Sequence, residues 1–164
     1  FNQLTTGDSA GALYCTSATS FLIESSSFFS CKASLSRGAI NFDNNDAQSV
    51  LYGVCGHDCC LTKSNNFQFA YRGVNNDVSS KNCVNYSSII RCVNGLSTSY
   101  ILYLKYGKIC CPSVNSSMNK CQYHSGITCY SSIDSSSFTC SFRNYLFSSN
   151  NAFGCICFCI DNNA

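Results

Sequence analysis

Short runs of alternating hydrophobic and polar residues recur along the whole chain. The clearest lie at 66–71, 88–92 and 100–106, and each is followed within a few residues by a glycine. This alternation is typical of a β-strand, because successive side chains of a strand point to opposite faces. The stretch SSSFFSCKASLSRGAINF at 25–42 also lacks the apolar spacing of a helix. We therefore predict β-strands throughout the chain and almost no helix.

The composition strengthens this prediction. Serine and asparagine supply most of the polarity and suit tight turns, whereas strong helix formers are scarce, with a single glutamate at Glu24. Charged residues make up 11% of the chain, against about 25% in an ordinary soluble domain. The net charge of +2, without a basic run, argues against nucleic acid or an anionic membrane as a partner. No apolar run approaches the length of about 18 residues that a membrane span requires.

Two stretches of the chain repeat each other, each with a phenylalanine, then a glycine, then an isoleucine two residues after the glycine. A partial copy precedes each stretch, so that the spacing is 27 residues from Gly11 to Gly38 and 28 residues from Gly126 to Gly154. A period of this length predicts a solenoid of stacked coils, since a single coil of strands cannot bury its inner face alone. The repeat positions are Gly11, Phe28, Gly38, Ile40, Gly126, Phe147, Asn150, Gly154 and Ile156.

Each position of the repeat has an expected role. The glycine allows a bend or the close approach of a neighbouring backbone. The upstream phenylalanine is expected in the core. Asn150 or its counterpart Cys31 follows at the turn, where stacked asparagine side chains could bond to neighbouring coils. Between residues 43 and 112 the motif is not visible, and the register of the coils there does not follow from the sequence. We expect residues 1–164 to form one β-helical domain.

Two halves of the motif carry a family resemblance. The sequences FSSN at 147–150 and RGAI at 37–40 resemble the Phe-x-x-Asn and Gly-Gly-Ala-Ile repeat of polymorphic outer-membrane-protein-like domains. Such domains occur in chlamydial surface autotransporters and in surface proteins of trichomonad type, and the cysteine-rich style here is more similar to the latter. The resemblance covers roughly residues 9–42 and 113–160. It implies a right-handed parallel β-helix outside the cell, used in adhesion or surface architecture, and it implies no catalytic residues.

The chain contains 15 cysteines, a density typical of secreted scaffolds with disulfides. The number is odd, so at least one cysteine has no partner within this chain. Sequons for N-glycosylation at Asn85 and Asn115 also favour export. We expect an extracellular or cell-surface glycoprotein, and, because the chain has no initiator methionine, a segment of a longer one. The disulfide candidates are Cys15, Cys31, Cys55, Cys59, Cys60, Cys83, Cys92, Cys110, Cys111, Cys121, Cys129, Cys140, Cys155, Cys157 and Cys159.

Strand geometry restricts how these cysteines can pair. The adjacent cysteines at 59–60 and 110–111 are expected to point to opposite faces, whereas the three in the run 155–159 alternate and share one face. Bridges to the next coil, about 4.8 Å away, are geometrically feasible. The connectivity itself does not follow from the sequence.

The sequence CGHDCC at 55–60 is the densest group of potentially reactive side chains. Cys55, His57 and Cys59 could hold zinc with a fourth ligand from elsewhere. Alternatively, Cys55 could act as a nucleophile with His57 or His124. The spacing is not that of paired Cys-x-x-Cys knuckles, and in a chain with so many cysteines some lie near a histidine by chance. We therefore interpret the segment as a disulfide-pinned loop with a surface histidine, and we expect no metal or other cofactor.

Three classes of function remain to be compared. A carbohydrate-active β-helix enzyme needs several carboxylates in one cleft, but the chain has eight acidic residues and one close pair, Asp43 and Asp46, in an asparagine-rich turn. A glycan-binding module could use exposed tyrosines such as Tyr103 and Tyr106, with host or cell-surface glycans as partners. The preferred interpretation is a non-enzymatic structural or adhesive surface protein.

Self-association is also expected. Apolar strands are predicted near residues 10–15 and 154–160, toward the two ends of the solenoid. Unpaired strand edges pair readily with other chains. Head-to-tail stacking uses two different surfaces and does not close on itself, so it leads to filaments.

Overall fold

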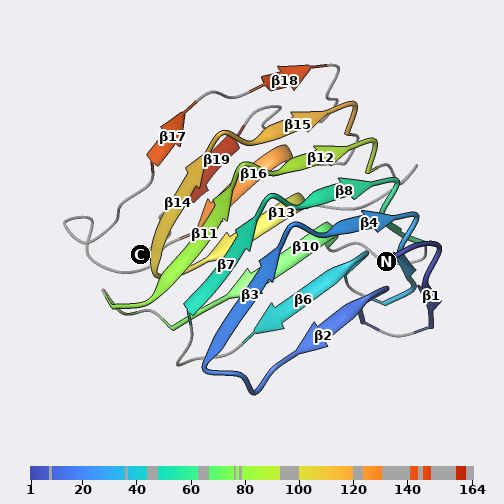
Figure 1. Ribbon diagram of the computed structural model, residues 1–164, viewed down its shortest axis with the longest axis horizontal. Helices are drawn as coiled ribbons and strands as arrows, with labels where there is room; N and C mark the ends of the chain where they lie inside the picture. The colour runs from blue at the N-terminus through green and yellow to red at the C-terminus, as the bar shows by residue number, and fades with distance from the viewer. Residues whose placement is uncertain are drawn as a thin grey trace.

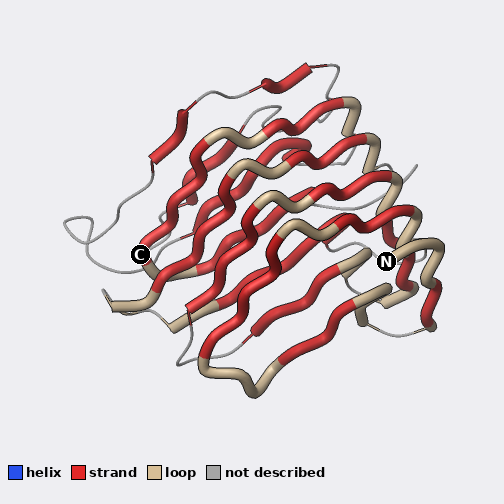
Figure 2. Tube along the Cα trace, viewed as in Figure 1, coloured by secondary structure: helices blue, strands red, loops and turns tan. Residues whose placement is uncertain are grey.

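Parallel β-strands make up all of the regular structure in the described part of the chain (Figures 1 and 2). This computed structural model confirms the prediction of a parallel β-helix, or solenoid, and shows that it has about four turns. The structure describes residues 1–7, 9–35, 37–43, 48–62, 67–75, 77, 79–92, 100–119, 124–130, 141–143, 146–148 and 158–161.

The strands form four sheets, named I to IV here, which the chain visits in turn. Sheet I contains β2 (Leu13–Cys15), β6 (Ile40–Asp43), β10 (Phe67–Gly73), β13 (Tyr100–Lys105), β16 (His124–Tyr130) and β19 (Phe158–Asp161). Sheet II contains β3 (Ser20–Glu24), β7 (Gln48–Tyr52), β11 (Lys81–Asn85), β14 (Lys108–Pro112) and β17 (Ser141–Arg143). Sheet III contains β4 (Ser27–Phe29), β8 (Cys55–His57), β12 (Ser88–Ile90), β15 (Asn115–Ser117) and β18 (Leu146–Ser148). Sheet IV contains β1 (Thr5–Thr6), β5 (Lys32–Ala33) and β9 (Cys60–Leu61).

The coils stack along one axis in chain order. In Figure 1 the strands of sheets II and III run across the face toward the viewer, and their colour changes steadily from blue at β3 and β4 to orange at β14 and β15. Each strand inside a sheet therefore lies between the strand of the coil before it and that of the coil after it, and the strands at the ends of the sheets have one neighbour. Each coil is thus one repeated unit, and it buries its inner face only by stacking against the neighbouring coils.

The first predicted repeat spacing is found in the structure, whereas the register between the last two strands of sheet I is longer than the second predicted spacing. Gly11 lies beside Gly38, with its amide 3.0 Å from the Gly38 carbonyl oxygen, which is the predicted period of 27 residues. A Cβ atom on Gly11 would lie 2.3 Å from that oxygen, so the close approach requires glycine. In the last coils Ile127 lies beside Phe158, so that the register there is longer than the alignment of Gly126 with Gly154 predicts. Gly154 itself lies outside the described residues.

The repeated phenylalanines occupy equivalent places, as the motif predicts. The middle residues of the sheet III strands are register partners from coil to coil: Phe28, Gly56, Ile89, Ser116 and Phe147. Phe28 is fully buried. A Cβ atom on Gly56 would lie 2.3 Å from the ring of Phe69, which enters from sheet I and packs edge-on against Phe28 at 6.1 Å. The glycine in this column thus makes room for an aromatic ring from the opposite side of the coil.

Sheet I supplies the other long column of the core. Ile40 lies beside Ala70, Ala70 beside Leu102, and Leu102 beside Ile127, and all four are fully buried. The spacing between partners changes from coil to coil, which is why the coil register between residues 43 and 112 does not follow from a fixed period. Burial of such apolar columns is the main stabilising contribution in a solenoid.

Single left-handed residues bend the chain between sheets. The turn from sheet II to sheet III uses Ser25, Gly53, Tyr86 and Ser113, with φ between 46° and 61°. The turn that leaves sheet III uses Ser30, Asp58, Arg91 and Met118, with φ between 52° and 56°. Their amides continue the ladder between coils; that of Asp58, for example, donates to the Ile90 carbonyl oxygen at 3.2 Å.

Candidate functional site at the edge of sheet III

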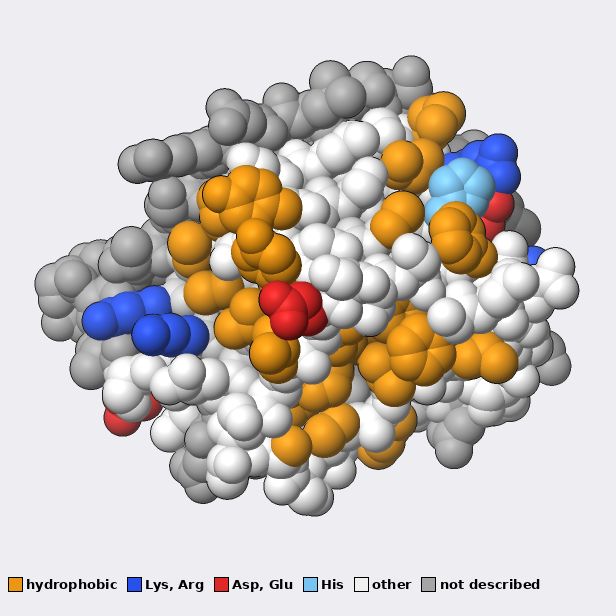
Figure 3. Space-filling model, in the orientation of Figure 1, with side chains coloured by type: hydrophobic (Ala, Val, Ile, Leu, Met, Phe, Trp, Pro, Cys, Tyr) orange, Lys and Arg blue, Asp and Glu red, His pale blue; other side chains and the backbone are white. Residues whose placement is uncertain are grey.

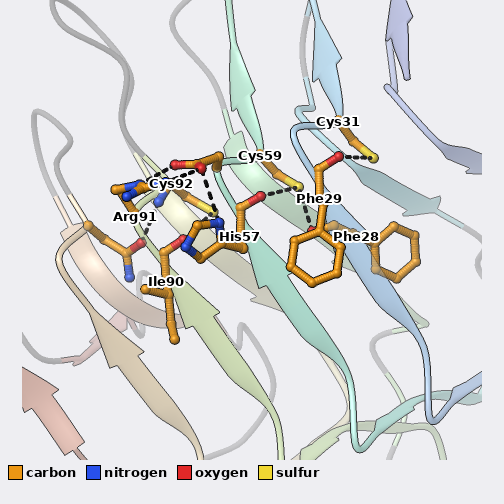
Figure 4. Close-up of polar contacts among 10 residues, drawn as sticks. Phe28, Phe29, Cys31, His57, Cys59, Ile90, Arg91 and Cys92 are labelled. Atoms are coloured by element: carbon orange, nitrogen blue, oxygen red, sulfur yellow. Dashed lines mark hydrogen bonds and ion pairs between the residues drawn. The ribbon is translucent and has the colours of Figure 1, made fainter. Parts of the chain in front are cut away.

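The turn that leaves sheet III builds the candidate site (Figure 4). Directly after the left-handed residue of each coil comes a fully buried side chain, and these side chains form a column. On the outer side of the same turn lie His57 and Arg91, both labelled in Figure 4, and Asp58, which contacts both of them. The column consists of Cys31, Cys59, Cys92 and Asn119.

Asn119 joins two coils through its side-chain amide. Its Oδ1 accepts from the Cys92 amide at 2.8 Å, and its Nδ2 donates to the Ile89 carbonyl oxygen at 3.0 Å and to Ser116 Oγ at 2.9 Å. This is the coil-to-coil bond that the motif predicts for Asn150, which lies outside the described residues. The prediction missed Asn119, although both asparagines stand three residues after the middle residue of a sheet III strand.

Each of the three cysteines of the column occupies, in its own coil, the position that Asn119 occupies in the last coil of the column. The Cys59 thiol donates to the Phe28 carbonyl oxygen at 3.3 Å, and the Cys31 thiol donates to the Phe29 carbonyl oxygen at 3.6 Å. A hydrogen bond between the two thiols lowers the pKa of Cys31 and raises that of Cys59, which burial raises further. Burial also raises the pKa of Cys92. Cys59 and Cys92 are therefore neutral thiols that fill space in the core.

Asp58 is held between two positively polarised groups. Its Oδ1 accepts from Arg91 Nε at 2.5 Å, its Oδ2 accepts from Arg91 Nη2, and His57 Nδ1 lies 3.0 Å from Oδ2. The bond from Arg91 lowers the pKa of the Asp58 carboxyl group, partly opposed by burial. The side chains of His57 and Asp58 are 29% and 28% exposed, so the group faces solvent on one side.

A hollow of about 470 Å³ lies beside this group and is lined by Ser30, Lys32, Asp58, Cys60 and Arg91. Burial raises the pKa of the Cys60 thiol, although the nearby Lys32 opposes the effect. A thiol with a raised pKa is a poor nucleophile at neutral pH. The carboxylate is already engaged by Arg91, so it is a poor general base as well. The arrangement is that of an ion pair that ties neighbouring coils together.

The structure separates the three side chains that could have held zinc. Cys59 is fully buried in the column, whereas Cys55 and His57 are half-buried on the outer side of β8. Within the described residues, no three His, Cys, Asp or Glu side chains are placed to share a metal ion. Of the remaining candidates, the side chain of His124 is not described, and Asp46, the partner proposed for Asp43, lies outside the described residues.

The adjacent cysteines point to opposite faces, as predicted. Cys59 and Cys111 are fully buried, whereas Cys60 and Cys110 are half-buried on the outside. No disulfide joins the ten cysteines whose side chains the structure describes. Those at 121, 140, 155 and 157 lie outside the described residues, and only the backbone of Cys159 is described, beside Thr128.

The sequon asparagines both lie at the ends of short strands on the outer surface. Asn85 and Asn115 are half-buried, and the Oδ1 atom of each is buried without a hydrogen-bond partner. The hydroxyl group of Ser87 donates to the Asn85 carbonyl oxygen at 2.9 Å and accepts from the Val54 amide. The hydroxyl group of the third sequon residue, Ser87, is therefore already used in hydrogen bonds within the fold.

Tyrosines gather on the outer face of sheet I. Tyr103 stacks with Tyr71 at 5.8 Å and with Tyr130 at 6.3 Å between ring centroids, and Tyr100 packs edge-on against it at 4.9 Å. Tyr106 lies 5.7 Å from Tyr130. Both tyrosines proposed for glycan binding thus belong to one aromatic cluster, in which Tyr71 is only 6% exposed and the others are half-buried.

No protein-family model, curated protein or solved structure matches this chain. The described part of the chain also contains no helix that could cross a membrane. The function therefore has to be inferred from the geometry.

Proposed function

We propose that this protein is a non-enzymatic structural or adhesive solenoid of the extracellular space or cell surface, and that it assembles by stacking end to end. The observation that carries the proposal is the open strand edge that sheets I and II present at the first coil; along sheet III the edge is covered, because Asn2 pairs with Phe29. Among the described residues, β2 pairs only with β6, and β3 pairs only with β7. Unpaired parallel strand edges accept a further coil of matching register.

The surface around this edge supports the proposal. Among the residues whose side chains the structure describes, nine large hydrophobic side chains are exposed, and six of them belong to the first 35 residues: Phe1, Leu4, Tyr14, Leu22, Phe29 and Leu35. Tyr14 on β2 and Leu22 on β3 are 61% and 65% exposed. A further coil would cover part of this apolar surface and satisfy the free backbone groups at once.

The chemistry at the edge of sheet III supports a structural role over catalysis. The only carboxylate in the described hollow is bound to Arg91, and the thiol that faces the hollow has a raised pKa. The extracellular location rests on the cysteine content and the two sequons. The relation to polymorphic outer-membrane-protein-like domains rests on the motifs alone.

Backbone geometry offers a sharp test of stacking. The Leu13 amide donates to the Ala39 carbonyl oxygen, so in a parallel ladder the amide of the next residue, Tyr14, points to the open edge. Replacement of Tyr14 with proline removes a donor from the open edge and leaves the ladder to β6 in place. Tyr14→Thr is the matched control, because it also removes the ring but keeps the amide.

Negative-stain electron microscopy without reducing agent is the measurement. We expect fibres from the unmodified protein and from Tyr14→Thr, and dispersed particles from Tyr14→Pro. Circular dichroism of each variant checks that the strand content is unchanged. Dispersed particles from the unmodified protein, at concentrations up to those at which it precipitates, would refute end-to-end assembly.

Glycan binding is a second candidate, supported by the half-exposed tyrosine cluster. Aromatic rings are common contacts for sugars, but here the rings of Tyr71, Tyr103 and Tyr130 stack mainly on one another. Binding to a glycan array that is lost in Tyr106→Ala, with folding unchanged, would favour this function. Absence of binding would leave the cluster as packing between coils.

A further inference from the structure

The outer face of sheet II brings two cysteines from neighbouring coils together. Cys83 on β11 is the direct register partner of Cys110 on β14. In the registers of the described strands, this is the one place where a cysteine lies beside a cysteine. Neighbouring strands lie about 4.8 Å apart, and this separation falls within the range of about 4.4–6.8 Å between the Cα atoms of disulfide-bonded cysteines.

Both thiols point to the same side. The residues that flank them along the strands, Asn82 and Val84 on β11 and Ile109 and Cys111 on β14, are fully buried. Cys83 and Cys110 alternate with these residues and are half-buried on the outer face. Burial raises the pKa of the Cys83 thiol, and Cys110 raises it further through its charge and through a hydrogen bond between the two side chains. The thiols are therefore in contact, on a face that a small oxidant can reach.

The surroundings favour a bond at this place. The pair continues an apolar stripe that runs along the solenoid axis from Leu22, which is 65% exposed, through Val50. Figure 3 shows hydrophobic side chains gathered on this face of the molecule. Lys81 and Lys108, also register partners and both exposed, lie two residues before the cysteines on the same face. Their positive charges attract an anionic disulfide to this face.

We propose that Cys83 and Cys110 form a disulfide that joins the third and fourth coils of the solenoid. One thiolate attacks a low-molecular-weight disulfide such as oxidised glutathione, forms a mixed disulfide and releases one thiol. The second cysteine then displaces the other thiol, so that the protein pair gives up two electrons and two protons and the oxidant becomes two thiols. This inference does not depend on end-to-end assembly.

The other described cysteines near this pair, or in similar contacts, differ from it in burial or in their register partners. Cys111 directly follows Cys110 but is fully buried, so it faces the core and not the oxidant. Cys31 and Cys59 also share a hydrogen bond between thiols, but both are fully buried within the turn column. Cys55 has serines, Ser27 and Ser88, as its register partners.

Peptide mapping of the intact protein tests the proposal. The folded protein is treated with oxidised glutathione, its remaining thiols are blocked with iodoacetamide under denaturing conditions, and it is digested with trypsin. We expect peptide 82–91, which contains Cys83 as its only cysteine, to be linked to peptide 109–120. Fragment ions should place the link at Cys110 and not at Cys111. A link of Cys83 to any other cysteine, or a carbamidomethylated Cys83, would overturn the proposal.

Variants give an independent measurement. Reduction is expected to lower the Tm of the unmodified protein and of the control Cys55→Ser, and to lower it much less in Cys110→Ser. Cys83→Ser should behave like Cys110→Ser, because either substitution removes the same bond. An equal Tm shift on reduction in the control and in both variants would show that this pair carries no disulfide. Mapping of the unmodified protein stays decisive even if a variant fails to fold.

Discussion

Arg72 is the most unusual residue of the core, and it yields a sharp prediction. It lies on β10, is fully buried, and occupies the same inward column as Phe42 and Leu104. Its Nε donates to Ser49 Oγ at 2.7 Å, its Nη2 donates to the same oxygen, and its Nη1 donates to the Cys83 carbonyl oxygen at 2.8 Å. These acceptors are all neutral. Burial lowers the pKa of Arg72 to about 9, so the guanidinium group still carries its charge at neutral pH.

Replacement of Ser49 with alanine removes the acceptor of two guanidinium N–H groups and leaves the buried charge poorly solvated. We expect the free energy of unfolding to fall by about 3 kcal/mol, since loss of a partner strands a buried charge. Arg72→Met removes the charge itself and keeps most of the volume. Buried ionic groups replaced by apolar ones often leave stability unchanged or higher, so we expect a change within about 1 kcal/mol. In the double variant the loss of Ser49 should then cost little, which gives a coupling energy of about 2–3 kcal/mol.

The assay is urea unfolding followed by far-ultraviolet circular dichroism, because the chain has no tryptophan. The midpoint gives the change in stability, provided that the dependence on denaturant stays constant among the variants. Ser20→Ala is the matched control, since Ser20 is exposed on the neighbouring strand β3. The reasoning is refuted if Ser49→Ala costs no more than Ser20→Ala, or if the effects of Ser49→Ala and Arg72→Met simply add.

Three further predictions concern the turns and the repeat. The pKa of Asp58 is lowered in the folded state, so its ion pair stabilises the protein at pH values above the pKa of Asp58 in the unfolded chain. This stabilisation is lost as the pH falls through the pKa of Asp58 in the folded protein. Asp58→Asn should therefore remove this acid dependence from unfolding curves. Asn119→Ala should lower the free energy of unfolding by about 2 kcal/mol, measured in urea, because it leaves buried backbone groups of a neighbouring coil without partners. Gly11→Ala should cost about 3 kcal/mol or prevent folding, because the new Cβ would overlap the Gly38 carbonyl oxygen, whereas Gly7→Ala, with no atom within 4 Å of its Cβ position, should be nearly neutral. Equal thermal stability of the two glycine variants would contradict this explanation.

Much of the candidate site could not be predicted from the sequence, and the left-handed turns explain why. Asp58 and Arg91 are far apart in the chain and have different side chains, yet they occupy the same left-handed position in successive coils. Nothing in their local sequence indicates this, because glycine is the residue expected at such positions. The sequence shows that residues 55–60 are rich in potentially reactive side chains. That Arg91 lies beside them follows only from the stacking of one coil on the next.

By itself, the sequence determined the class of fold and the local direction of side chains. Period-two alternation and a lack of helix formers lead to strands, the spacing of Gly11 and Gly38 leads to one coil length, and the adjacent cysteines at 110–111 must face opposite sides. These are local properties of the chain, so neighbouring residues suffice to set them. Only the tertiary structure decided which coil positions meet. Residues that pair in a parallel solenoid are a full coil apart in the sequence, and the coil length changes from turn to turn. The register of whole coils therefore decides that Cys83 pairs with Cys110 and that Arg72 is buried against Ser49.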